Sequence, residues 1–261
     1  MAKDKQSPLV TIITGVASTV LAALILYFIG IKSSGEPIKL DDANNQGELI
    51  TGETPAKEKD VYKTSPVYRT EKIEPNLEPL EYYRIGYSKF EADDFNNAIQ
   101  YFSKAITDSS TYSLAYCMRG FSKRHLEDYS GAIKDYSIAI QLNPKSYYYY
   151  NNRAVVKFFL EDYESVIKDC TKSIELFPNN SHPFNNRANA YYMLGKYDQA
   201  KDDYQRAIDL EPNYTDALKG LGDCLLYFGE KDKACEYWKK GKFLGDKACK
   251  ELWEKHCTEE K

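Results

Sequence analysis

A repeat with a fixed period of 34 residues constrains the fold of this chain more than any other feature of its sequence. Small residues or Val recur at this spacing without an insertion, and an aromatic residue or Leu lies at the fourth position of every unit. Apolar residues on either side of a short turn follow the spacing of amphipathic helices. The residues that define the period are Ala98, Ala132, Val166, Ala200 and Ala234. The pattern predicts two helices in each of five units, at residues 79–112, 113–146, 147–180, 181–214 and 215–245.

The repeat resembles the tetratricopeptide repeat (TPR) family. Residues 184–212, FNNRANAYYMLGKYDQAKDDYQRAIDLEP, match most positions of the family signature. The resemblance covers residues 79–245 and implies an all-α fold, a TPR α-solenoid of five helix-turn-helix repeats. Residues 246–261 are expected to form a C-terminal capping helix and tail that cover the last apolar face of the array.

The N-terminal part of the chain has a different chemistry. After a flank at residues 1–7, residues 8–31 carry no charge and are long enough to cross a bilayer, which takes about 20 residues. A cleaved signal peptide is the alternative, although its apolar core would be shorter and followed by a cleavage site. Residues 32–78 combine prolines and charges without an apolar period, which is typical of a disordered linker. The sequence thus predicts a single-pass membrane protein with an N-terminal transmembrane helix in the lipid bilayer. The distribution of lysines places the repeats outside the cytoplasm.

Charge and motifs limit the function classes. The net charge of −4 and the pI of about 5.6 argue against nucleic acid as a partner, because nucleic-acid binders carry a basic patch. No phosphate loop, dinucleotide fingerprint, CxxC pair or nucleophile elbow is present in the sequence, so no catalytic residue and no cofactor is expected. A metal site made from Cys249, His256 and Cys257 is not expected either, because neighbours on a helix point in different directions.

A comparison of the five units reveals a second pattern. Position seven is Arg in the three middle units and aliphatic in the outer two. Position twenty-three changes together with it and is Asp in the middle units and Tyr in the outer two. We predict partly buried ion pairs within each middle unit, whose function is structural. A row of arginines that binds an acidic ligand is the alternative. The predicted pairs are Arg119 with Asp135, Arg153 with Asp169, and Arg187 with Asp203.

The resemblance also implies a site. In TPR domains the first helices of successive units line a concave groove that binds an extended peptide or protein segment. Amide side chains can both donate to and accept from a peptide backbone, and aromatic side chains offer contact area. Some of these aromatic residues could instead cover their own neighbours. The residues carried over to the groove are Tyr83, Tyr87, Phe121, Tyr148, Asn151, Asn152, Phe158, Asn185, Asn186, Asn189, Tyr192, Lys219 and Tyr227.

Two further expectations follow from the resemblance. The carboxylate clamp for acidic chaperone tails needs Lys and Asn, then Asn, then Lys and Arg in three successive units. The middle units instead offer Cys117 and Phe121, then Asn152, then His182 and Asn186, so recognition of an acidic chaperone tail by this mode is not expected. Cysteines at positions ten and twenty-one of the fifth unit face each other across TPR helices, which makes a disulfide between Cys224 and Cys235 possible in an oxidising compartment.

The sequence therefore predicts a non-enzymatic, membrane-tethered scaffold or adaptor that binds a protein segment in the groove. The alternative is a structural subunit of a membrane-associated oligomeric assembly in which the groove is unused.

Overall fold

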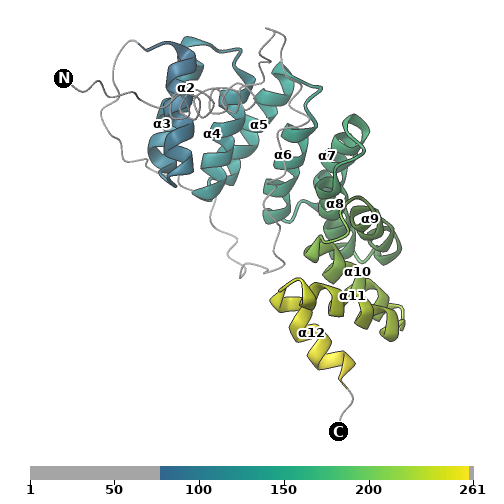
Figure 1. The fold of residues 1–261 in the computed structure, drawn as a ribbon. Helices are drawn as coiled ribbons and strands as arrows, with labels where there is room; N and C mark the ends of the chain where they lie inside the picture. The colour runs from purple at the N-terminus through teal and green to yellow at the C-terminus, as the bar shows by residue number, and fades with distance from the viewer. Residues whose placement is uncertain (1–76, 259–261) are drawn as a thin grey trace, which may run out of the picture. The chain divides into compact units, whose positions relative to one another are not determined.

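A computed structural model describes residues 77–258, which form helices α2 to α12 and contain no strand (Figure 1). The first helix of each unit begins where the period of the sequence places the start of that unit. These first helices are α2 (Pro79–Glu91), α4 (Ser113–His125), α6 (Tyr147–Phe159), α8 (Ser181–Met193) and α10 (Thr215–Tyr227). The second helices are α3 (Phe95–Asp108), α5 (Tyr129–Leu142), α7 (Tyr163–Leu176), α9 (Tyr197–Leu210) and α11 (Lys231–Phe243), and α12 (Lys247–Cys257) follows them.

The turn between the two helices of a unit has the same construction throughout the array. One residue adopts a positive φ, between 56° at Asp93 and 79° at Gly229, and this residue stops the first helix. In the first three units the next residue, an Asp, caps the second helix. The Asp128 carboxylate, for example, accepts from the Gly131 amide at 3.0 Å. Local sequence thus sets where the first helix of each unit ends and, in the first three units, where the second helix begins.

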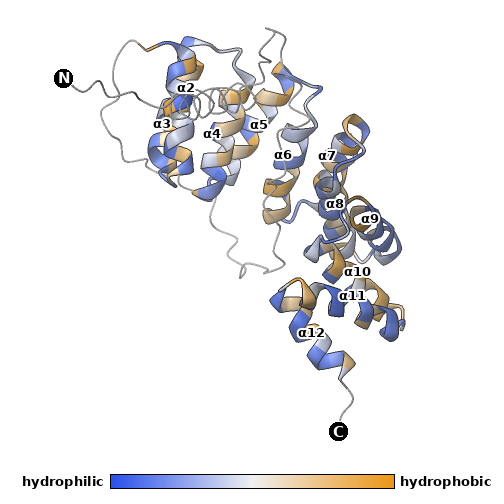
Figure 2. Cartoon of the chain, viewed as in Figure 1, coloured by the Kyte–Doolittle hydropathy of each residue, from blue (hydrophilic) through white to orange (hydrophobic). Residues whose placement is uncertain are grey.

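Small residues allow the two helices of each unit to approach closely. Ala98, Ala132 and Ala200 are fully buried. A Cβ atom at Gly120 would lie 3.2 Å from the Tyr136 ring, which already fills the space beside it. Bulky residues on the facing helix complete the packing, and every helix shows hydrophobic and hydrophilic residues side by side (Figure 2). This alternation of small and large residues is what the period in the sequence encodes.

The first helices lie on the inner side of the array. Each helix packs on the next one along the chain, and each first helix also contacts the first helix of the next unit. Successive second helices make no comparable contact in the described residues. The helix α12 occupies the place of a further first helix, because it packs on α11 and also contacts α10.

The membrane location predicted from the sequence is wrong for the helices that the structure describes. The described helices have 11 to 14 residues, whereas a span needs about 20. Each one also carries the polar side chains of a helix that packs along one stripe. Among residues 77–258, no helix is both long enough and apolar enough to cross a membrane. The predicted anchor at residues 8–31 lies outside the described residues, as does nearly all of the predicted linker at residues 32–78.

Candidate functional site

Three arginines on first helices form paired hydrogen bonds with aspartates on second helices. Arg153 donates to Asp169 through Nε at 2.9 Å and through Nη2 at 2.7 Å, and the aspartate is buried. The same fork joins Arg119 to Asp135 and Arg187 to Asp203. These are the pairs that the comparison of the units predicts. Such bidentate pairs fix the angle between two helices as well as adding energy.

The third nitrogen of each guanidinium reaches the preceding unit, which the sequence reasoning missed. Arg119 Nη1 donates to Ser103 Oγ at 3.0 Å, and Arg153 and Arg187 bond in the same way to Ser137 and Thr171. Each arginine therefore joins two second helices, one in its own unit and one in the unit before. The signal was present in the sequence, because position twenty-five carries Ser or Thr in each unit that precedes an arginine.

A lysine one turn beyond the arginine contacts the same carboxylate in two of the units. Lys123 Nζ lies 2.7 Å from Asp135 Oδ2, and Lys157 Nζ lies 2.8 Å from Asp169 Oδ2. The corresponding residue in the fourth unit is Tyr191, and burial raises the pKa of Asp203 despite its bonds to Arg187. Because the guanidinium of each of these three arginines is bonded to two other helices, the arginines have a structural role. They do not form a row that is available to an acidic ligand.

Asparagines from two neighbouring first helices, α6 and α8, gather on the inner side of the array. Asn186 Nδ2 donates to Asn151 Oδ1 at 3.0 Å and so connects α8 with α6. Asn152 Nδ2 donates to the Tyr148 carbonyl at 2.9 Å. The Tyr204 hydroxyl donates to Asn189 Oδ1 at 2.6 Å. In each case one amide atom orients the side chain, and the other amide atom of Asn152, Asn186 and Asn189 takes part in none of these bonds.

Exposure divides the predicted groove residues into two groups. Tyr83 packs against Phe102 and Tyr112, with ring centroids 5.5 Å and 5.1 Å away, and Asn185 is fully buried beside the Tyr214 hydroxyl. Their assignment to a ligand-contacting surface is corrected, because neighbouring side chains cover them. Phe121, Asn151, Asn152 and Asn186 are also buried, with small exposed fractions. The half-buried or exposed residues are Tyr87, Tyr148, Phe158, Asn189, Tyr192, Lys219 and Tyr227.

The edge of this surface at the fourth and fifth units is aromatic. Tyr227 is 64% exposed, and its ring centroid lies 3.9 Å from that of Tyr197. Tyr192 meets Tyr197 edge to face at 5.1 Å. Because these rings come from three helices and support one another, Tyr192 and Tyr227 are held in position before any partner arrives.

Charged residues follow the amides in the fifth unit. Lys219 Nζ bonds to Asp223 Oδ2 at 2.8 Å. Burial raises the pKa of Asp216 to about 6, and the nearby Asp246 carboxylate adds to the shift, while Lys219 opposes it. The inner side therefore carries amides in the third and fourth units and a charged group in the fifth. We refer to the first-helix side chains on this side of the array as the inner face.

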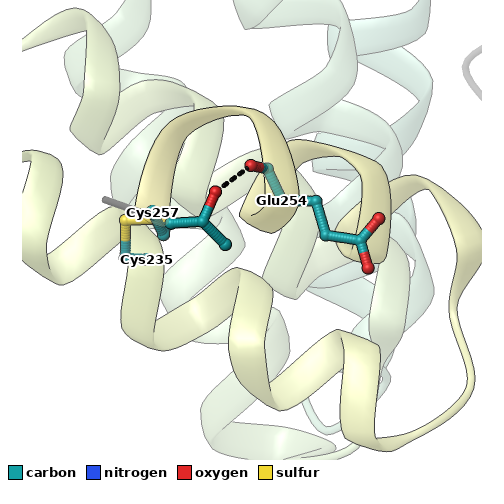
Figure 3. Close-up of a disulfide and its surroundings, with 4 residues drawn as sticks. Cys235, Glu254 and Cys257 are labelled. Atoms are coloured by element: carbon teal, nitrogen blue, oxygen red, sulfur yellow. Dashed lines mark hydrogen bonds between the residues drawn. A yellow bond between two sulfur atoms is a disulfide. The ribbon is translucent and has the colours of Figure 1, made fainter. Parts of the chain in front are cut away.

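The structure corrects the predicted disulfide. Cys235 bonds to Cys257 at the end of α12, across 22 residues of sequence (Figure 3). Cys224 is a fully buried free thiol in the core of the fifth unit, and burial raises its pKa to about 12. The sequence argument failed because it considered only faces within one repeat, whereas the partner of Cys235 lies in the helix beyond the last repeat.

These features define a protein built of paired helices in tandem, with a polar and aromatic inner face. Tetratricopeptide repeat family models match residues 82–107, 147–180 and 183–214. The chain thus contains tetratricopeptide repeats, and the resemblance inferred from residues 79–245 is confirmed to that extent. Among curated proteins, none matches the chain in sequence.

Solved structures with the same fold support this assignment. The crystal structure of MamA has a TM-score of 0.57 at 20% identity, and the match covers 66% of this chain and 97% of that one. YrrB, described as a TPR protein with an unusual peptide-binding site, has a TM-score of 0.57 at 18% identity, with coverages of 68% and 92%. PilF of Pseudomonas aeruginosa has a TM-score of 0.59 at 18% identity, with coverages of 62% and 74%. Identities this low establish the fold and not a shared partner.

Proposed function

We propose that this protein is a non-enzymatic scaffold that binds an extended segment of a partner protein along the inner face. The TPR fold is typical of protein-protein interaction scaffolds, and YrrB is described as having a peptide-binding site. One observation carries the proposal for this chain, namely the half-buried Asn189, whose amide the Tyr204 hydroxyl orients one turn of α8 before the aromatic edge at Tyr192.

The amides suit a peptide backbone for a physical reason. A peptide in extended conformation presents alternating N–H and C=O groups, and an amide side chain can pair with either. Since the oxygen of the Asn189 amide is already bonded within the protein, its nitrogen is held in a fixed direction. Little side-chain entropy is then lost when a ligand arrives. The adjoining rings of Tyr192 and Tyr227 supply apolar contact beside the polar row.

The buried cysteines of the repeats are unsuited to nucleophilic catalysis. Cys117, Cys170 and Cys224 are fully buried, and burial raises the pKa of each thiol. Reactive cysteines need a lowered pKa and access to solvent. These three thiols therefore serve packing.

A peptide selection with the purified full chain tests the proposal. A random peptide library displayed on phage is selected against the protein, and enriched peptides are titrated with the wild type and with single variants. We expect Asn189→Ala and Tyr192→Ala each to weaken binding at least about tenfold, which corresponds to about 1.4 kcal/mol.

The control variants carry substitutions on second helices. Lys168→Ala and Arg206→Ala alter exposed residues of α7 and α9, outside the inner face, and are expected to leave the affinity unchanged. Selection of no peptide, or equal losses in the two groups of variants, would contradict binding at the inner face. Circular dichroism of each variant checks that the helices are intact.

A further inference from the structure

Helix α12 is held by fewer buried side chains than the helices of the repeats. Cys249 is the residue of α12 that the structure buries, whereas α10 buries seven. The Cys249 side chain fills the space above Gly241, where a Cβ atom would collide with its sulfur. Leu252 and Trp253 of α12 pack against the core but are only partly buried, and Lys242 Nζ lies 3.8 Å from the Trp253 ring centroid and 3.9 Å from Glu254 Oε1. Noncovalent packing of α12 is therefore modest.

Besides the short backbone connection, a disulfide links α12 covalently to the last repeat. It joins Cys235 in α11 to Cys257, the last residue of α12 (Figure 3). Both of these cysteines are half-buried, while the four free cysteines are all buried. A small thiol reagent in solvent therefore reaches the disulfide before it reaches the free thiols.

The free thiols do not compete for the bond either. Burial raises the pKa of Cys249, the nearest of them in sequence, and the Asp246 carboxylate adds to the shift. Because the thiolate is the attacking species in thiol–disulfide exchange, Cys249 stays a thiol and leaves the bond intact.

We propose that the Cys235–Cys257 disulfide is a redox latch, which keeps α12 docked on the last repeat when oxidised and releases it when reduced. A dithiol reductant opens the latch in two steps. Its thiolate attacks one sulfur to form a mixed disulfide, and its second thiol then displaces the remaining cysteine. The dithiol becomes a cyclic disulfide, and two electrons and two protons pass to Cys235 and Cys257, which become thiols. Release of α12 uncovers Trp238, Gly241 and Cys249, which α12 helps to bury in the closed state.

Two internal probes of the latch already exist in the chain. Its only two tryptophans, Trp238 and Trp253, belong to α11 and α12. Trp238 is fully buried and lies 5.6 Å from the His256 ring between centroids, so tryptophan emission reports on docking. Cys249 reports independently through its reaction with an alkylating reagent, with Cys117 and Cys170 of the middle repeats as controls in the same molecule.

The test compares the full chain before and after reduction with dithiothreitol. Alkylation by iodoacetamide is followed for each cysteine by mass spectrometry, and tryptophan emission is recorded in parallel. The chain-entropy relation for a link across 22 residues predicts that reduction raises the alkylation rate of Cys249 by up to about 300-fold. The emission maximum is expected to shift to the red, while the alkylation of Cys117 and Cys170 is expected not to change.

A variant without the latch completes the design. In Cys235→Ser with Cys257→Ser, Cys249 should react as fast as in the reduced wild type, whether or not dithiothreitol is present. If this variant does not fold, the comparison of oxidised and reduced wild type still tests the proposal. Protection of Cys249 that stays within about threefold after reduction, with unchanged emission, would overturn the proposal. A parallel rise at Cys117 and Cys170 would overturn it as well, because it would mean that the whole array opens and not α12 alone.

Discussion

Removal of Arg187 should destabilise the array more than removal of Arg153, although both arginines make the same three bonds. Arg187→Met and Arg153→Met each keep the aliphatic stem and delete the guanidinium. Asp203 then loses its cation, whereas Asp169 keeps Lys157 at 2.8 Å. Breaking a buried pair costs about 3–5 kcal/mol, and the 18% exposure of the Arg187 side chain favours the lower end, about 3 kcal/mol. With a second charged hydrogen bond retained at Asp169, we expect a loss of about 1–2 kcal/mol for Arg153→Met.

The difference should also depend on pH. Burial already raises the pKa of Asp203, and loss of Arg187 raises it further, so the folded carboxyl binds its proton at higher pH than the unfolded one. The destabilisation by Arg187→Met should therefore shrink as the pH is lowered and the folded carboxyl takes up its proton.

Urea unfolding combined with hydrogen exchange of α8 and α9 measures the effect, since exchange resolves individual repeats. The double variant Arg187→Met with Asp203→Leu should recover most of the loss, because it leaves no unpaired buried charge. Equal losses at the two arginines, or a larger one at Arg153, would refute the role given to Lys157.

Four other substitutions test three separate features. The pKa of Asp216 is raised from 3.8 to about 6, so the wild type loses stability as the pH rises through this window. Asp216→Asn should therefore stabilise the protein by about 1–2 kcal/mol at pH 7.5 and have little effect at pH 4. Thermal melts at a series of pH values measure the difference. Gly195 and Glu161 both have positive φ, and nothing lies within 4 Å of a Cβ atom at Gly195, so a substitution there changes only the backbone preference. Gly195→Ala should therefore destabilise the protein by about 1 kcal/mol, whereas Glu161→Gly should not destabilise it, as the urea midpoints of the two variants will show. Gly241→Ala should destabilise the docking of α12 by about 1–3 kcal/mol, because the added methyl group collides with Cys249; a faster alkylation of Cys249 with the disulfide intact would show it.

The repeat architecture could be predicted from sequence because every unit needs a small residue at the same position, where its two helices pack together. Alanines spaced by the period mark the places where two helices meet, and Pro79 marks the start of the first. The pairs of Arg with Asp were predictable for the same reason, since two positions change together along the array. Ser103 and its counterparts precede each arginine by one unit, at a position that a comparison restricted to Arg and Asp does not include.

Other parts of the site could not be predicted from position alone. A repeat position tells which way a residue points, and not what covers it. Asn185 and Asn189 both belong to first helices, but Tyr214 from the following loop lies against Asn185, while Asn189 stays half-buried. The disulfide is a similar case, because Cys257 lies beyond the last unit and has no counterpart to compare.

The arginine bonds also bear on how tightly neighbouring units are coupled. In a linear array the stability depends on the coupling between nearest neighbours, and each of the first three joints carries a guanidinium that bonds on both sides of it. At the fourth joint Leu221 replaces the arginine, and the Tyr237 hydroxyl donates to Gln205 at 3.2 Å instead. The fifth unit is thus the first that should open when the array frays, and it is at this end of the molecule that a covalent bond takes over from hydrogen bonds.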